Sequence, residues 1–174
     1  DSHSNMMIYD SKYETLEHFE PYGSSNSYDR NLFEQEIFRE FVETGMVKKY
    51  LPNNKLCPYI GPQSKESSEK PRRIHHGFCT IWSFWYADLR LSFPDIDPKK
   101  LLKMAMTRLG GPVGSGFYNQ IVGYTKFIIN YLRILKQRNK KMLVKYRKNN
   151  VTNRDNDGKK ESIIHFQIFR SCLP

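Results

Sequence analysis

The chain has 174 residues, 39% of them hydrophobic and 14% aromatic, which excludes a disordered protein and suffices for one buried core. No window holds about 18 uninterrupted apolar residues, so we expect no membrane-spanning helix and no membrane partner. The three cysteines form neither a disulfide framework nor a Cys-x-x-Cys metal pair, which favours a reducing compartment. The N-terminus, Asp1-Ser2-His3-Ser4, has no Met and no apolar signal core, so we expect a fragment of a longer protein.

The net charge of +10 is unevenly distributed along the chain. Residues 1–100 carry 13 Lys/Arg against 15 Asp/Glu, a balance of −2. Residues 101–174 carry 15 against 3, a balance of +12. Any contact with a polyanion such as a nucleic acid is therefore expected in the C-terminal part.

Two short strands are predicted at the start, over residues 4–9 and 14–19, with a turn at 10–13. If residues 11 and 12 form a two-residue loop, cross-strand partners have numbers that sum to 23, and His3 faces Glu20. Opposed side chains of an antiparallel pair have Cβ atoms about 5 Å apart. A carboxylate beside an imidazole fixes its tautomer and stabilises the imidazolium. The simpler alternative is an exposed His–Glu pair at the end of a sheet.

An amphipathic helix is predicted over residues 30–44, where apolar residues recur at helical spacing. Its expected apolar face consists of Leu32, Phe33, Ile37, Phe38, Phe41 and Val42. Residues 46–63 are expected to be irregular or short strand, because prolines and glycines interrupt them. Residues 64–73 are polar and charged and predict an exposed loop.

Three further helices are predicted in the second half. A dense apolar run predicts a largely buried helix over 79–92, and Asp97 is expected to cap a second helix that ends near Leu109. A third helix is predicted over 116–138. Residues 138–160 are expected to be polar and mobile, and residues 163–169 to form a closing strand. No internal repeat is visible in the sequence.

Cys79 is the candidate nucleophile. It opens the apolar helix, and a thiol at a helix N-terminus is favoured in its ionised form. The small Gly77 before it leaves room for a substrate backbone. The alternative is a buried structural cysteine at the start of a core helix.

Gln63 is the candidate oxyanion donor. Its amide could act together with the backbone N–H of Cys79 on the oxyanion of a tetrahedral intermediate. The alternative is a glutamine in a surface loop. His75 and His76 lie just before the cysteine, but we interpret them as bystanders in a polar insertion.

Two segments resemble a known family. His3 followed by Phe19-Glu20-Pro21-Tyr22-Gly23 resembles the adenovirus protease (adenain) family, which has its His and Phe-Glu-Pro-Phe-Gly segment at the same separation. The run from Gly77-Phe78-Cys79 to Leu91 is similar to segments in proteases predicted for large DNA viruses. The order His, acid, Gln, Cys is also that of the ubiquitin-like-protein (SUMO) proteases. The resemblance covers roughly residues 3–92.

The resemblance implies an α+β, papain-like fold in which a central mixed sheet packs on the nucleophile helix. It implies a cysteine protease that hydrolyses peptide or isopeptide bonds of a viral polyprotein or a ubiquitin-like conjugate. Cys79 would attack the carbonyl, His3 would act as the base, Glu20 would orient His3, and Gln63 would hold the oxyanion. Residues 1–137 would be the catalytic domain and 138–174 a basic, partly mobile extension. No cofactor or metal is expected, and an intracellular location in host cytoplasm, nucleus or virion is implied.

Two alternatives remain at this point. The first is a protease-like domain without activity that binds other molecules. The second is nucleic-acid contact through the basic run, which contains Arg133, Lys136, Arg138, Lys140, Lys141, Lys145, Arg147 and Lys148. Such a run is more often a solvated helix end. The oligomeric state is open.

Overall fold

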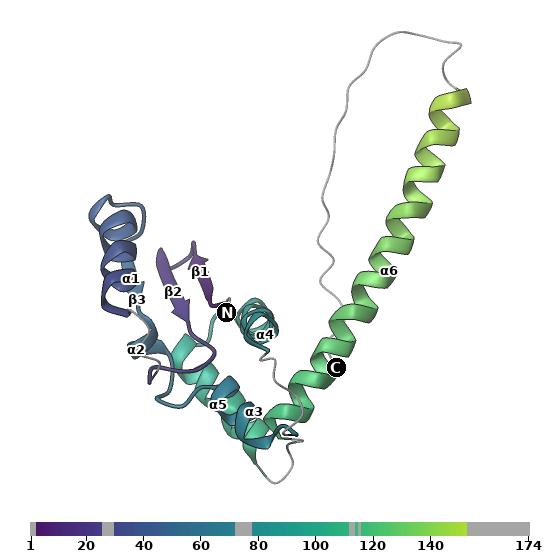
Figure 1. Ribbon diagram of the computed structural model, residues 1–174. Coiled ribbons are helices and arrows are strands. Elements are labelled where there is room, and N and C mark those ends of the chain that lie inside the picture. The colour runs from purple at the N-terminus through teal and green to yellow at the C-terminus, as the bar shows by residue number, and fades with distance from the viewer. Residues whose placement is uncertain (1–2, 26–29, 72–77, 112–113, 115, 153–174) are drawn as a thin grey trace. The chain divides into compact units, whose positions relative to one another are not determined.

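The computed structural model describes residues 3–25, 30–71, 78–111, 114 and 116–152 (Figure 1). The chain divides into two compact units, Asp1–Asn130 and Tyr131–Pro174. The first unit contains the strands, the first five α-helices and the beginning of the last helix. The predicted boundary between residues 137 and 138 stays a prediction.

A small mixed sheet lies inside the first unit (Figure 1). β1 (Met6–Asp10) pairs antiparallel with β2 (Thr15–Phe19), and β2 pairs parallel with β3 (Lys49–Leu51). The central strand is β2, and all five of its residues are buried. The described elements are those of an α+β chain with a mixed sheet. A papain-like arrangement of them stays a prediction.

The register of β1 and β2 differs from the predicted one. Met6 pairs with Phe19, so partner numbers sum to 25 and not to 23. The difference arises in the turn, which takes the four residues 11–14 instead of two. The Asp10 carboxylate accepts hydrogen bonds from the backbone N–H groups of residues 12 and 13, and Glu14 has a positive φ of 49°. An Asp side chain that holds the turn residues in this way stabilises the longer connection.

One face of the sheet packs against α4 (Cys79–Ser92), which has the predicted bounds. Trp82 and Tyr86 are both fully buried, and the Tyr86 ring stacks on that of Phe19 with centroids 4.2 Å apart. Burial of each such side chain stabilises the fold by about 1.5–3 kcal/mol. The main core contains Phe19, Leu56, Cys57, Trp82, Trp85, Tyr86, Leu102, Met106, Phe117 and Ile121.

A buried ion pair joins the same two layers. Arg90 Nη2 lies 2.8 Å from Oε1 of Glu17, whose side chain is 1% exposed. The Tyr86 hydroxyl donates to the other oxygen of that carboxylate at 2.7 Å. Arg90 Nη2 also lies 3.3 Å from a carboxylate oxygen of Asp10. These contacts occur in one position of the helix on the sheet, so they fix how α4 lies on β2.

Helix α1 (Arg30–Ile37) and the π-type turns of η1 (Phe38–Glu43) supply a second cluster. The cluster contains the buried residues Leu16, Ile37 and Val47. The prediction of one regular helix over 30–44 is therefore wrong in its second half. The expected apolar face is also wrong in part, because Ile37 is buried but Leu32, Phe33 and Phe38 are 63%, 43% and 46% exposed.

Two short helices occupy the stretch that was expected to be irregular. They are α2 (Asn53–Leu56) and α3 (Pro62–Glu69). The prediction of an exposed loop over 64–73 is wrong for residues 64–69. Pro62 stands at the first position of α3, where proline fits a helix. The buried positions of α3 are Pro62, Gln63 and Glu66, so no apolar periodicity marks this helix in the sequence.

The last two helices are α5 (Pro98–Gly110) and α6 (Phe117–Thr152). Asp97 caps α5 as predicted, because its side chain accepts the backbone N–H of Lys100 at 2.8 Å. α6 continues beyond residue 138, where the sequence predicted its end and a mobile segment. Residues 140–148 are mostly good helix formers (Lys, Arg, Met, Leu), and polarity alone does not end a helix. The predicted strand over 163–169 lies outside the described residues.

Candidate functional site

The structure brings His3 and Glu20 together. His3 Nε2 lies 2.8 Å from Oε1 and 2.9 Å from Oε2 of the Glu20 carboxylate. Both residues lie just beyond the paired strands, and the ring centroid of Tyr22 is 5.2 Å from that of His3. The Glu20 side chain is 7% exposed and that of His3 is 34% exposed. In neutral His3 the carboxylate favours the proton on Nε2 and leaves Nδ1 as an acceptor.

The segment after Glu20 is fixed by a close approach of two backbones. Gly61 N donates to Tyr22 O at 2.8 Å, and Gly23 has a positive φ of 96°. A Cβ atom on Gly61 would lie 2.3 Å from Pro21 O, and one on Gly23 would lie 2.3 Å from Gly61 N. Glycine is therefore required at both positions. This packing gives the Glu-Pro-x-Gly pattern a structural reason of its own.

Cys79 is the first residue of α4 and has a free, partly exposed thiol. The residues that follow His3 and Cys79 touch, since Ser4 Oγ and Thr80 Oγ1 lie 2.8 Å apart. The N-terminal segment thus lies against the start of α4. Among the described residues, however, no hydrogen bond joins Cys79 Sγ to the His3 ring.

Tyr22 lies in the same cluster, and the sequence analysis did not single it out. Burial raises the pKa of its hydroxyl, and the nearby Cys79, Glu66 and Glu20 raise that pKa further. Its carbonyl also accepts the hydroxyl of Ser64 at 2.8 Å. The sequence shows Tyr22 only as one residue of the Phe-Glu-Pro-Tyr-Gly segment, and its neighbours Glu66, Ser64 and Cys79 come from the tertiary structure.

Gln63 lies at the second position of α3 and is 1% exposed, so the surface-loop interpretation is wrong. Its backbone N–H donates to Pro21 O at 3.0 Å. In the part of the chain that the structure describes, its side-chain Oε1 has no hydrogen-bond partner. One turn further along the helix, the fully buried Glu66 accepts the indole N–H of Trp82 at 3.3 Å. Gln63 and Glu66 therefore form a buried polar face of α3 toward the start of α4.

The chemistry open to this polar cluster is proton exchange at His3 and reaction of the Cys79 thiol. No group of three or more His, Cys, Asp or Glu residues among those described could hold a metal ion. His75 and His76 lie outside the described residues. The structure joins His3 to Glu20 and places the Gln63 N–H on Pro21 O beside them, but it shows no hydrogen bond between the Cys79 thiol and its predicted base.

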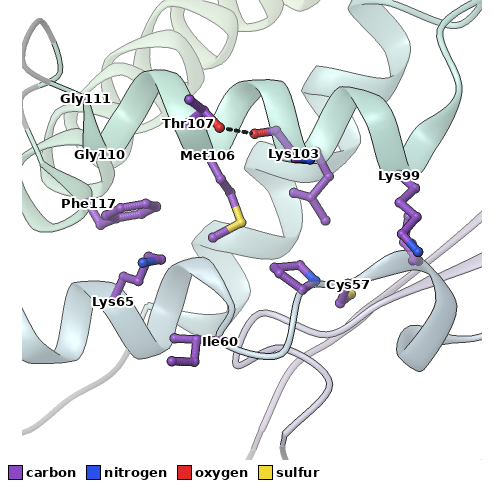
Figure 2. Close-up of a pocket in the computed structure, with 13 residues that line it drawn as sticks. Cys57, Ile60, Lys65, Lys99, Lys103, Met106, Thr107, Gly110, Gly111 and Phe117 are labelled. Carbon is purple, nitrogen blue, oxygen red and sulfur yellow. Dashed lines mark hydrogen bonds between the residues drawn. The ribbon is translucent and has the colours of Figure 1, made fainter.

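A groove that the sequence did not predict lies at α5 and has a volume of about 570 Å³ (Figure 2). This volume is within the range of about 300–1,000 Å³ that is usual for ligand pockets. Its floor consists of the buried side chains of Leu56, Leu102, Met106 and Phe117. Its full lining is Leu56, Cys57, Pro58, Ile60, Lys65, Lys99, Leu102, Lys103, Met106, Thr107, Gly110, Gly111 and Phe117.

Three exposed lysines stand around the groove, and none of its lining residues is acidic. Lys99 and Lys103 lie one turn apart on α5 (Figure 2). Lys65 comes from α3, and its ammonium group lies 5.6 Å from the centre of the Phe117 ring. The alternation of lysines and apolar residues on α5 is visible in the sequence. The partners that turn it into a groove come from α2, α3 and α6.

Comparison with known proteins gives one curated relative. The chain is 33% identical over 142 residues to "Putative ankyrin repeat protein L371" of Acanthamoeba polyphaga mimivirus. The match covers 73% of this chain but 18% of the relative, so the chain spans about a fifth of the protein that it matches. No family model matches the chain, and no solved structure matches it.

These findings contradict the predicted family and activity. The relative carries the name of a repeat protein and not of a protease, and no protease family matches. The predictions of an adenovirus-protease-like family, of a cysteine endopeptidase or deubiquitinase-like hydrolase, and of a viral substrate are therefore wrong. The alternative of an inactive protease-like domain with a nucleic-acid-binding half gains no support either. The catalytic roles assigned to His3, Glu20, Cys79 and Gln63 depended on that activity.

The segments that carried the resemblance have structural explanations. Gly23 allows a close backbone contact, and Trp82 and Tyr86 fill the core against the sheet. None of the described helices combines the length and the apolar character that crossing a bilayer requires.

Proposed function

We propose that this chain is a protein-interaction domain that binds a segment of a partner protein in the groove at α5. The observation that carries the proposal is the groove of about 570 Å³ between α5 and the α2–α3 segment, whose floor is apolar. A concave, mostly apolar site with a few polar groups at its edge is the usual character of a binding site.

The relative supports a role of this class. It is named for ankyrin repeats, and such repeats stack into solenoids whose concave surface binds other molecules. This chain has no internal repeat, and its described part contains a mixed sheet, so the repeats are a property of the relative. The match covers about a fifth of the relative. This is consistent with a binding domain that stands beside the repeats in such a protein.

Selection from a library of random peptides displayed on phage would test the proposal. We expect peptides that bind the full chain with micromolar affinity and compete with one another for one site. Thr107→Trp places a large ring in the groove from an exposed position on α5 and should weaken these peptides at least about tenfold.

The matched control is Met104→Trp, which adds the same ring at a 53% exposed position of α5 outside the groove. It should leave peptide affinity within about twofold of wild type. Failure to select any peptide, or equal binding by the two variants, would overturn the proposed function.

A further inference from the structure

The lysines at the groove differ from several other exposed cations of the first unit. Lys12, Lys48 and Arg39 each form an ion pair, with Asp95, Glu14 and Glu36 respectively. Lys65, Lys99 and Lys103 form no ion pair with a described residue. Their charges are therefore available to carboxylates supplied from outside this part of the chain.

All three lysines line the same groove. Lys99 and Lys103 come from consecutive turns of α5, and Lys65 comes from α3 (Figure 2). The lining of the groove contains three lysines and no acidic residue, and positive groups gathered in this way create a local potential that attracts anions and speeds their association. The groove therefore selects for negative charge at its edge.

The floor of the groove favours apolar groups. Leu102 and Met106 line the groove with aliphatic and thioether groups. Figure 2 shows the Phe117 ring near Met106. Methionine adapts its shape to varied apolar partners. A simple phosphate or a nucleic-acid backbone would leave this floor without a partner, because its contacts are polar. A peptide with a bulky apolar side chain between acidic residues satisfies both the floor and the lysines.

We infer that the occupant of the groove is an acidic peptide segment, with one or two large apolar side chains on the floor and Asp or Glu residues facing the lysines. This inference rests on the proposed function and adds the chemistry of the partner. The lysines contribute to affinity and association rate, and the floor contributes the larger part of the binding free energy.

The peptides selected against wild type provide the test. We expect them to be enriched in Asp and Glu around a Leu, Ile, Met or Phe residue. The affinity of one such peptide should fall as salt rises from 50 to 500 mM, since exposed charge pairs are screened. The double variant Lys99→Glu/Lys103→Glu should bind this peptide about threefold to tenfold more weakly than wild type does. A peptide in which Lys replaces the acidic residues should instead bind the double variant more tightly than wild type.

The matched control is Lys100→Glu, an exposed lysine of the same helix that does not line the groove. It should change peptide affinity less than twofold. Peptides that are lost in Thr107→Trp but show no acidic enrichment and no response to charge reversal would overturn the inference and leave the proposed function intact. Competition by laurate together with a failure of all peptides would overturn both, because the groove would then be a site for a small amphiphile.

Discussion

Arg90 makes the main polar contact between α4 and the sheet. Its guanidinium donates to Glu17 from Nε at 2.9 Å and from Nη2 at 2.8 Å, and Nη1 donates to the carbonyls of Phe93 and Ile96. Glu17 is almost fully buried, so removal of Arg90 would leave an unpaired carboxylate in the core.

We expect Arg90→Met to lower the free energy of unfolding by about 3–5 kcal/mol. Arg39→Met serves as the control, because Arg39 pairs with Glu36 at the surface and should change stability by less than about 1 kcal/mol. Urea denaturation of the three proteins measures both values. Equal midpoints would show that the buried pair does not stabilise α4 on the sheet.

Glu66 gives the chain a dependence on pH. Burial raises the pKa of its carboxyl above the usual value, although hydrogen bonding from Trp82 acts in the opposite direction. The Glu66 carboxyl therefore keeps its proton in the folded state at pH values where it has lost that proton in the unfolded chain. The stabilisation is fully present below the unfolded pKa, and it is lost as pH rises through the folded pKa.

Glu66→Gln should remove this loss, because the amide resembles the protonated acid and carries no charge. We expect the variant to be more stable than wild type at pH 7 and to lose that advantage as pH falls through the raised pKa toward about 4.5, the usual value for this group. Unfolding midpoints measured from pH 3.5 to pH 7.5 test this prediction. A difference that does not change with pH would contradict it.

The pairing of His3 with Glu20 could be predicted from the sequence, although the register used to predict it was wrong. A hairpin holds residues near its open end within a few ångströms in several registers, so direct and diagonal partners are both within reach. The position of Cys79 at a helix start was also predictable, because apolar periodicity begins there. The burial of Gln63 was not, since it depends on a backbone contact with Pro21 that lies far along the chain.

At the scale of elements, the contact between residues 21–25 and 58–61 determines where α3 begins. Gly61 has an ordinary negative φ of −81°, so its requirement is steric and comes from the opposite backbone. Backbone atoms on both sides leave no flexible side chain that could move aside. The start of α3, and with it the burial of Gln63 and Glu66, depends on this approach.

Gly61→Ala should therefore destabilise the chain by at least about 2 kcal/mol. The same substitution at Gly123 in α6, where an added Cβ meets nothing within 4 Å, should stabilise it by about 0.5–1 kcal/mol. Thermal unfolding followed by circular dichroism compares the two variants. A neutral Gly61→Ala would mean that the two backbones can separate without cost.

The sequence did not predict α3, because its residues are polar. It did not predict η1 either, where α-type turns give way to π-type turns along the chain. A helix whose buried face consists of Pro, Gln and Glu gives no hydrophobic period, so the pattern indicated a loop. In residues 30–43 the apolar period is present, but Leu32, Phe33 and Phe38 stay exposed and the second half has π-type turns. In both elements contacts elsewhere in the fold outweigh the local signal.

At the scale of the whole molecule, the core lies in the first unit. The main cluster ends at Ile121, and residues 131–142 of α6 are mostly exposed. A chain that ends at Asn130 should keep the urea midpoint of the full chain within error and lose only helical signal in the far-ultraviolet spectrum. A chain that ends at Gly111 lacks Phe117 and Ile121 and should lose several kcal/mol. Unfolding of the chain that ends at Asn130 would contradict the division into two units.

The sequence by itself determined the limits of α4, the cap of α5, the proximity of His3 and Glu20, and the basic character of the second half. These features depend on residues that are close in sequence, or on a composition that no fold alters. The tertiary structure decided the register of the hairpin, the burial of Gln63 and Glu66, and the groove at α5. Each of these needs segments that are distant in the chain to meet, and local preference holds no information about which segments meet.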